Sequence, residues 1–140
     1  MSDPAVRGIV LAHGTMADGL VDAVRQITGA EADLLTPLSN RGLSPEAIAA
    51  AVRAHVHGPT IVFTDLQTGS CGFAVRRYCQ DLPDLIVMSG VNLPVLLEFV
   101  MHRALPVNEL VPKILARGKS AIASSKFNSE SNEHRAVSGG

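Results

Sequence analysis

The sequence predicts one α/β domain built on a doubly wound, mainly parallel sheet with helices on both faces. Short apolar runs alternate along the chain with segments of helical period, and this alternation is typical of parallel α/β folds. The 140 residues suit a single domain, and 46 % hydrophobic residues are enough to form its core. We expect the domain to cover residues 1–125. Residues 126–140, which are nearly free of apolar side chains, should form a flexible tail.

The first expected strand and helix are strongly patterned. Residues 6–12 form an almost unbroken apolar run, as a strand buried on both faces would. Residues 15–28 then place Val24 and Ile27 on one helical face, and Gly29 supplies a C-terminal stop. The chain therefore begins with a buried strand that leads directly into a helix.

The second strand and helix are bounded by turn residues. Residues 33–38 are a weaker strand candidate, and a Ser-Asn-Arg-Gly turn follows them. Ser44 starts the next helix, because serine caps helix N-termini and Pro45 suits the first helical position. We expect this helix to end near residue 57, just before Gly58.

Two strands and three helices complete the expected order. Residues 60–65 and 85–89 are short apolar runs rich in β-branched side chains, so both predict strands. A loop with two glycines is expected at residues 67–72. The helices are expected at residues 73–79, 93–104 and 108–118, the last of them capped by Asn108.

The composition of the chain limits which cellular compartment and which class of binding partner we expect. The formal net charge of −1 and the lack of a basic cluster argue against a nucleic-acid partner. No run approaches the roughly 20 apolar residues that span a bilayer, and the N-terminus lacks the positive head of a signal peptide. Cys71 and Cys79 would lie roughly 12 Å apart on one helix, too far for a disulfide. We therefore expect free thiols and a cytoplasmic protein.

Polar residues follow three of the predicted strands, at residues 13–14, 65–72 and 90–94. In open α/β sheets, the carboxyl ends of the strands meet at one edge, where ligands bind at a topological switch point. His13 ends the first strand, beside a helix that begins near Thr15 and favours an anion at its N-terminus. Gly14 lets the backbone approach closely. These features predict a histidine that accepts a phosphoryl group.

Asp65 and the Gly69-Ser70 pair are expected to complete the site. A carboxylate at the end of a neighbouring strand can accept the second ring N–H of His13, which fixes the tautomer and stabilises positive charge on the ring. The Ser70 hydroxyl and nearby backbone N–H groups can cradle phosphate oxygens. This chemistry needs no metal and no cofactor. His55 and His57 lack nearby cysteine or carboxylate partners for a metal site.

Three motifs together resemble the mannose-type enzyme IIA domains of the bacterial phosphoenolpyruvate-dependent sugar phosphotransferase system. They are Ile-Val-Leu-Ala-His-Gly at residues 9–14, the strand 60–65 continued by Gly69-Ser70, and Ser-Gly-Val-Asn-Leu-Pro-Val-Leu-Leu-Glu at residues 89–98. They occur in the family's order and spacing over about residues 8–123. The resemblance therefore covers most of the chain.

The resemblance implies a function and an assembly. His13 would take a phosphoryl group from the carrier HPr and give it to a IIB partner that phosphorylates a sugar. Asp65 would orient the ring, and Ser70 would lie where the loop approaches the phosphate. The family also implies a homodimer that exchanges a late antiparallel strand, here around residues 120–125, and only indirect membrane association through the transporter. The sequence does not identify the sugar.

The sequence departs from the family in the loop after Asp65. The family loop usually reads Gly-Gly-Ser/Thr-Pro, whereas here it reads Thr-Gly-Ser-Cys at residues 68–71. A cysteine at a helix N-terminus can have a lowered thiol pKa. One hypothesis is that Cys71 acts as a redox brake on transfer, and the other is that it has no role.

Rival sites lack required residues. A histidine phosphatase needs an arginine directly before the histidine, and this position is Ala12. A receiver domain that uses Asp65 as its phosphoacceptor needs acidic residues at the end of the first strand, where Ala12 and His13 stand. A sirohydrochlorin-type chelatase needs a second inward ligand that the sequence does not indicate. A regulatory module remains open, in which phosphorylation of His13 changes affinity for another protein without relaying phosphate to a sugar.

Overall fold

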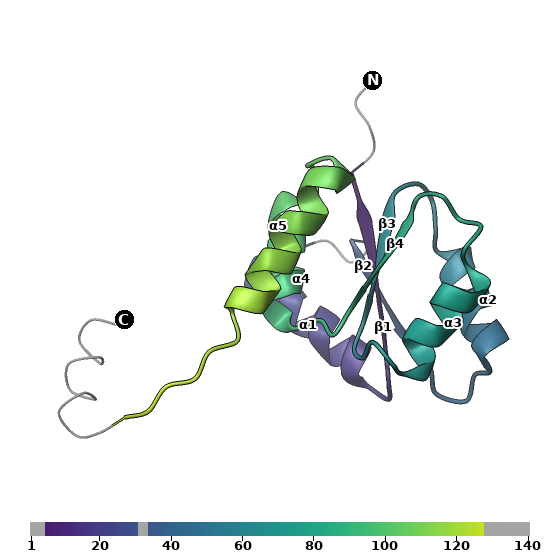
Figure 1. Ribbon diagram of the computed structural model, residues 1–140, viewed down its shortest axis with the longest axis horizontal. Helices are drawn as coiled ribbons and strands as arrows, with labels where there is room; N and C mark the ends of the chain where they lie inside the picture. Colours follow the sequence, from purple (N-terminus) through teal and green to yellow (C-terminus); the bar gives the residue numbers. More distant parts are fainter. Residues whose placement is uncertain (1–4, 31–33, 128–140) are drawn as a thin grey trace.

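Four parallel strands form a single sheet in the order β2-β1-β3-β4 (Figure 1). The computed structural model describes residues 5–30 and 34–127. The strands are β1 (Arg7–Ala12), β2 (Leu35–Ser39), β3 (Thr60–Thr64) and β4 (Leu85–Ser89). All three strand pairs are parallel, which confirms the predicted α/β class.

Helices cover both faces of the sheet, as predicted. One face carries α1 (Met16–Thr28), α4 (Leu93–His102) and α5 (Val107–Ser120), and the other carries α2 (Pro45–Ala54) and α3 (Ser70–Tyr78) (Figure 1). Alternate residues of β1 serve the two layers, because successive side chains of a strand point to opposite faces. Val10 packs with the α1 and α4 side, whereas Ile9 and Leu11 pack with the α2 and α3 side.

The strand order creates a switch point between β1 and β3. The chain leaves β1 toward β2 by way of α1, and it later reaches β4 from β3 by way of α3. These crossovers run outward in opposite directions from the centre of the sheet, and their helices lie on opposite faces. In sheets of this topology, ligands bind at the carboxyl ends of the strands beside such a switch point, here β1 and β3. His13 and Asp65 follow these two strands.

Most predicted boundaries agree with the structure to within three residues. The fourth strand spans residues 85–89 as expected, and Gly29 ends α1 in the left-handed conformation with φ of 69°. The Ser44 side chain accepts a hydrogen bond from the Ala47 N–H, which confirms the predicted cap of α2. This helix ends at Ala54 rather than near residue 57.

The N-terminal ends of two helices differ from the prediction in detail. The segment 67–72 was expected to be a loop, but α3 already begins at Ser70 and includes Gly72. A Cβ atom on Gly72 would approach the Gln67 carbonyl oxygen to 3.2 Å, so this glycine permits close packing rather than a loop. Asn108 does not cap α5, whose N-cap position is Pro106.

The expected strand at residues 120–125 is not formed within the described part of this single chain. Ser120 ends α5, and residues 122–127 continue as an irregular segment that leads away from the sheet (Figure 1). Of the predicted tail, residues 128–140 lie outside the described residues. Among the helices of the described ranges, none has the length and apolar character needed to cross a bilayer.

Candidate active site

Neighbouring strand ends bring His13 and Asp65 into direct contact. Leu11 of β1 pairs with Thr64 of β3, so the residues that follow both strands share one edge of the sheet. Nδ1 of His13 lies 2.7 Å from Oδ2 of Asp65. The backbone N–H of His13 donates to the same carboxylate oxygen at 3.0 Å. The predicted His–Asp pair is therefore present, held by the ring and the backbone together.

The environment of Asp65 keeps its carboxylate ionised. Burial alone would raise the pKa of this carboxyl, but the hydrogen bonds and charge of His13 outweigh it, so the pKa is lowered. The other oxygen, Oδ1, accepts the Leu66 N–H at 3.0 Å. Because an ionised carboxylate only accepts, Nδ1 of His13 must be the protonated ring nitrogen. In the neutral form of this ring, Nε2 is then the nitrogen with the lone pair.

Nε2 of His13 faces the N-terminus of α3. The Ser70 hydroxyl oxygen lies 3.4 Å from it, and the His13 side chain is 42 % exposed. A Cβ atom on Gly69 would come within 2.9 Å of Cε1 of His13, so only glycine lets the loop approach the ring this closely. The Gly69 N-cap makes no side-chain hydrogen bond to the helix. Free N–H groups of the first turn of α3 can therefore bind an anion beside Nε2.

The remaining predicted residues have different positions. Gly14 forms the turn after β1 with φ of 58°, and its carbonyl oxygen accepts the Ser39 hydroxyl at 2.8 Å. Thr15 is the exposed N-cap of α1, and its side chain makes no cap hydrogen bond. The structure therefore brings together His13 and Asp65 with the glycine and serine of the loop, and gives Gly14 a backbone role.

Sequence reasoning missed the contribution of the loop after β2. Nδ2 of Asn40 donates to the Ser70 hydroxyl at 3.3 Å, and the Asn40 N–H donates to the Ala12 carbonyl at 3.3 Å. Residues 39–42 were predicted only as a turn. The signal that could have found them is the strand order, because β2 beside β1 puts this turn at the same sheet edge as His13.

The hypothesis that Cys71 has a lowered pKa is wrong. Its side chain is buried against the sheet, and burial, with the nearby charge of Asp65, raises the pKa of the thiol to about 11. Burial also raises the pKa of Cys79. Both cysteines are free thiols, as predicted, and Cys71 is unsuited to act as a redox brake.

The ligand atoms of His13, Asp65 and Cys71 lie within 4.8 Å of one another. Tetrahedral ligands of a zinc ion are roughly 3.4 Å apart, since each is 2.0–2.3 Å from the metal. The His13–Asp65 separation of 2.7 Å is shorter and is that of a direct hydrogen bond. The protonated, buried Cys71 is also a poor ligand. The group therefore fits a hydrogen-bonded pair better than a metal centre.

Comparison with known proteins identifies similar chains. A family model described as "PTS system fructose IIA component" matches residues 8–115. The sorbose-specific EIIA component of the phosphotransferase system (PTS) of Klebsiella pneumoniae is 31 % identical over 98 residues, which are 68 % of this chain and 73 % of that protein.

Two solved structures extend the similarity to the fold. An EIIA component of the phosphotransferase system from Streptococcus agalactiae has a TM-score of 0.79 at 25 % identity, covering 85 % of this chain and 96 % of its own. A mannose/sorbose-specific IIA subunit from Enterococcus faecalis has a TM-score of 0.75 at 26 % identity, with coverage of 89 % and 98 %. The described fold is therefore shared over nearly the full length of both proteins.

Proposed function

Because the chain belongs to the mannose-type EIIA family of the sugar phosphotransferase system, we propose that it carries a phosphoryl group on His13. The donor is phospho-HPr, and the acceptor is a IIB component that serves sugar uptake. A carrier that works beside these two proteins acts in the cytoplasm and reaches the membrane only through the transporter. The reaction is a transfer between protein histidines, so the chain is a phosphotransferase component.

The observation that carries this proposal is the orientation of the His13 ring. Nδ1 is bonded to Asp65 and Nε2 is open toward Ser70, so Nε2 is the nitrogen that attacks phosphorus. Its lone pair forms the new P–N bond, while the P–N bond of the donor breaks and its electron pair returns to the donor ring. The His13 ring becomes cationic, and the Asp65 carboxylate stabilises that charge through Nδ1–H.

The first turn of α3 supports the same step. Phosphoryl transfer spreads negative charge over three equatorial oxygens, and catalysis consists mostly of positioning and electrostatic stabilisation. The Ser70 hydroxyl, 3.4 Å from Nε2, can donate to one of these oxygens, and the backbone N–H groups at the start of α3 can donate to others. Gly69 keeps this cradle against the ring.

Exposed apolar side chains around the site suit protein partners. Met16, Leu66 and Phe73 are 44 %, 54 % and 49 % exposed. Met16 begins α1 three residues after His13, Leu66 directly follows Asp65, and Phe73 lies in the first turn of α3. We infer that HPr and IIB dock in turn on this apolar rim, since both must reach the same Nε2.

The test is phosphorylation by purified phosphoenolpyruvate, enzyme I and HPr, followed by addition of IIB. We expect acid-labile phosphate on the chain that disappears into IIB. His13→Ala should abolish the label, whereas the matched control His57→Ala, at an exposed position after α2, should keep it. Undiminished label in His13→Ala would refute the assignment. Label that never moves to IIB would favour the regulatory role.

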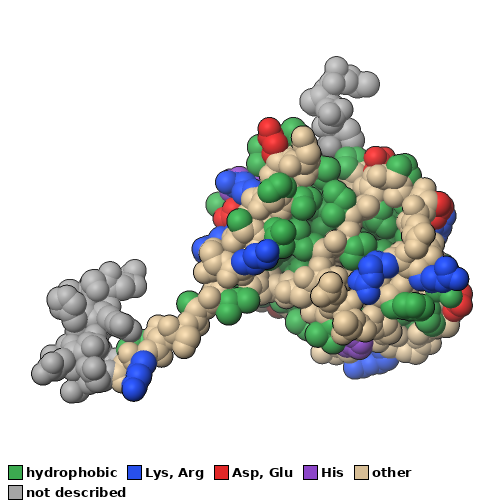
Figure 2. All heavy atoms as spheres, in the orientation of Figure 1, with side chains coloured by type: hydrophobic (Ala, Val, Ile, Leu, Met, Phe, Trp, Pro, Cys, Tyr) green, Lys and Arg blue, Asp and Glu red, His purple; other side chains and the backbone are tan. Residues whose placement is uncertain are grey.

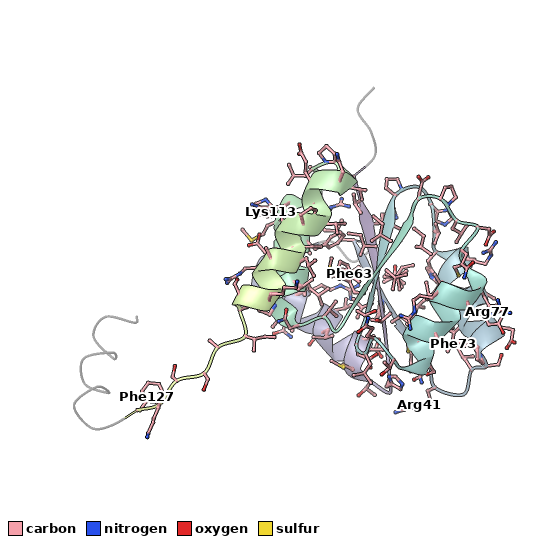
Figure 3. The ribbon with its side chains drawn as sticks, in the orientation of Figure 1. Arg41, Phe63, Phe73, Arg77, Lys113 and Phe127 are labelled. Carbon is pink, nitrogen blue, oxygen red and sulfur yellow. The ribbon has the colours of Figure 1, made fainter. Side chains whose placement is uncertain are left out.

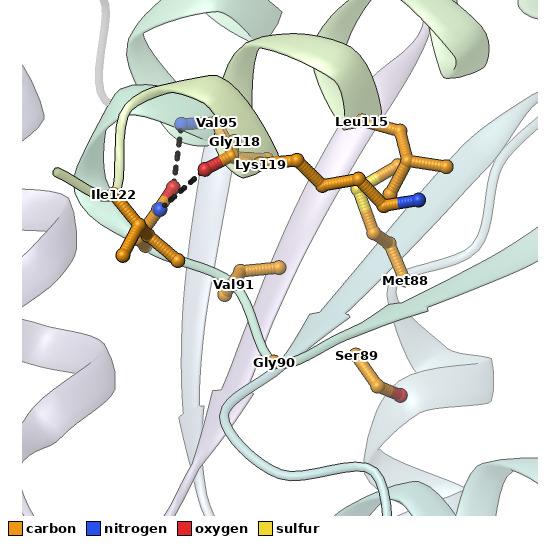
Figure 4. A pocket seen from close by; sticks show the side chains of 10 residues that line it. Met88, Ser89, Gly90, Val91, Val95, Leu115, Gly118, Lys119 and Ile122 are labelled. Atoms are coloured by element: carbon orange, nitrogen blue, oxygen red, sulfur yellow. Dashed lines mark hydrogen bonds between the residues drawn. The ribbon is translucent and has the colours of Figure 1, made fainter.

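The open edge of the sheet supports the proposed homodimer. Among the described strands, β4 has a neighbour on one side only, and a pocket of about 140 Å³ lies between it and the C-terminal end of α5 (Figure 4). Hydrophobic side chains gather in the hollow over this edge (Figure 2). Ile122 and Phe127 are 77 % and 57 % exposed on the segment that leaves α5. We propose that this segment pairs as an antiparallel strand with β4 of a second copy.

A further inference from the structure

We propose that Arg41, in the loop between β2 and α2, is the cation that contacts the phosphoryl group on Nε2 of His13. This inference rests on the proposed function and adds to it a residue outside the three family motifs. The starting point is the parallel register, in which Ser39 at the end of β2 lies beside Ala12 at the end of β1. The next residues along the two strands therefore emerge at the same edge.

Hydrogen bonds fix the backbone of Arg41 against the His13-Gly14 turn. The Ser39 hydroxyl donates to the Gly14 carbonyl at 2.8 Å and accepts the Arg41 N–H at 3.1 Å. The Leu43 N–H donates to the Asn40 carbonyl at 3.1 Å, closing a turn in which Arg41 and Gly42 are the central residues. Gly42 has φ of 73°, which suits the third position of a type II turn.

The side chain of Arg41 also lies at the site. Its Nη2 atom is 3.4 Å from the position that a Cβ atom would take on Gly14, the residue directly after His13. Figure 3 labels Arg41 at the carboxyl end of the sheet. The preceding residue, Asn40, donates to Ser70, whose hydroxyl lies 3.4 Å from Nε2. This loop therefore reaches both the turn after β1 and the start of α3.

Once His13 carries a phosphoryl group, the net negative charge of the site favours a nearby cation. A phosphoryl group carries about −1.5 to −2 at pH 7, and Asp65 adds another negative charge, while the loaded ring contributes one positive charge. Arg76 of α3 donates from Nη2 to the Gln67 carbonyl at 2.6 Å, so its guanidinium is bonded to the loop between β3 and α3. Among the described residues, no salt bridge engages the guanidinium of Arg41. It can give two parallel N–H donors to phosphate oxygens.

Potassium phosphoramidate tests this role without any partner protein. It donates its phosphoryl group to Nε2 of His13 as its P–N bond breaks and ammonia leaves. We expect Arg41→Gln to slow this labelling by about 10- to 100-fold, and Arg41→Lys to restore part of the rate. Arg77→Gln, which removes an exposed arginine that lies over the Tyr78 ring instead, is the matched control and should label as fast as the original protein.

A second readout separates a phosphate contact from a structural effect. The pKa of the phosphoryl group, followed by ³¹P NMR, should rise in Arg41→Gln because a nearby cation favours the more charged form. Normal labelling and an unchanged phosphoryl pKa in Arg41→Gln would overturn the role of Arg41 and leave His13 as the carrier. If neither phosphoramidate nor phospho-HPr labels His13 in the original protein, the proposed function itself fails, and the role of Arg41 fails with it.

Discussion

One oxygen of Asp65 accepts two hydrogen bonds from His13, one from the ring and one from the backbone. The ring bond fixes which nitrogen carries the proton, and the backbone bond fixes where the residue stands at the strand end. Neither bond alone would hold the position and the tautomer together. The orientation of Nε2 is therefore a property of two residues that lie 52 positions apart in the sequence.

The first prediction concerns this carboxylate. Asp65→Asn should slow phosphoryl transfer by roughly 10² to 10⁴-fold, because a neutral amide stabilises the cationic ring less well. The fold should persist, since an amide oxygen can still accept the His13 N–H. Rapid-quench measurement of transfer from phospho-HPr, with circular dichroism as the folding control, checks both parts. Transfer at the original rate would contradict the orienting and charge-stabilising role.

The sequence identified the central residues but not the loop that supports them. His13 and Asp65 each end an apolar run and Ser70 lies in the loop after Asp65, so their type and position predict a shared edge. Asn40 and Arg41 read as an ordinary turn, because their contact with the site depends on β2 lying beside β1. The lowered thiol pKa predicted for Cys71 is wrong because it too depends on how the elements pack. Whether a side chain in the first turn of a helix faces the solvent or the sheet depends on where the helix packs.

At the scale of elements, close helix packing depends on single glycines. α4 and α5 pack so closely that a Cβ atom on Gly118 would lie 2.2 Å from Cγ2 of Val95. The Asn92 side chain also links the two helices, because its Oδ1 caps α4 at Val95 N–H while its Nδ2 donates to the Gly118 carbonyl. The sequence predicted both helices. It could not predict this contact, because Gly118 reads as a helix stop.

The second prediction uses this contact. Gly118→Ala should destabilise the protein by about 1–3 kcal/mol, since an added methyl group overpacks the contact with Val95. Gly19→Ala is the matched control in α1, where no atom of the described residues, apart from the adjacent residues and the nearby helix backbone, lies within 4 Å of the added Cβ. It should stabilise the protein by about 0.5–1 kcal/mol. Urea unfolding of both variants measures the difference, and equal effects would show that the packing at Gly118 does not matter.

The third prediction concerns the ion pair that joins α2 to the segment after α3. The Arg53 guanidinium donates to both carboxylate oxygens of Asp81, at 2.8 Å and 2.5 Å. These hydrogen bonds lower the pKa of Asp81 to about 2. The pair therefore stabilises the fold above the ordinary carboxyl pKa of 3.8, and this contribution is lost as the pH falls toward 2.

Arg53→Gln should return the pKa of Asp81 toward 3.8, which NMR titration of its carboxyl carbon can follow. Arg77→Gln should leave the Asp81 pKa unchanged, because the guanidinium of Arg77 lies over the Tyr78 ring instead. A pKa near 3.8 in the unsubstituted protein would argue against a persistent pair in solution.

At the scale of the whole molecule, the strand order decides where chemistry can occur. The periodic pattern of the sequence was enough to predict the α/β class, because each strand is short, apolar and followed by a helix. The order β2-β1-β3-β4 then places the switch point between β1 and β3 and leaves β4 at an edge of the described sheet. The hydrophobic pattern of the sequence could not predict the structure of the segment after α5, because the strand with which we propose it pairs belongs to a second copy of the chain.

The fourth prediction tests the proposed exchange. The full chain should have twice the 14.7 kDa mass of a single copy in sedimentation equilibrium. Ile122→Asp should shift it toward the monomer, since the aspartate would be buried against β4 of the second copy. Ile27→Asp makes the same change at an exposed position of α1 and should leave the dimer intact. A monomeric full chain would refute the exchange.

Under the proposed function, the double anchoring of His13 affects how partner proteins would distinguish the phosphorylated chain from the unphosphorylated one. Ring and backbone are held by Asp65 before any phosphoryl group arrives, so loading changes the charge of the surface much more than its outline. Recognition of the loaded state then depends on electrostatic potential, which salt screens over about 10 Å at 0.1 M ionic strength. The proposed partner contacts with Met16, Leu66 and Phe73 are apolar and would not weaken in this way. Raising the salt concentration should therefore reduce the difference in partner affinity between the phosphorylated and unphosphorylated states. It should have a smaller effect on the affinity that both states share.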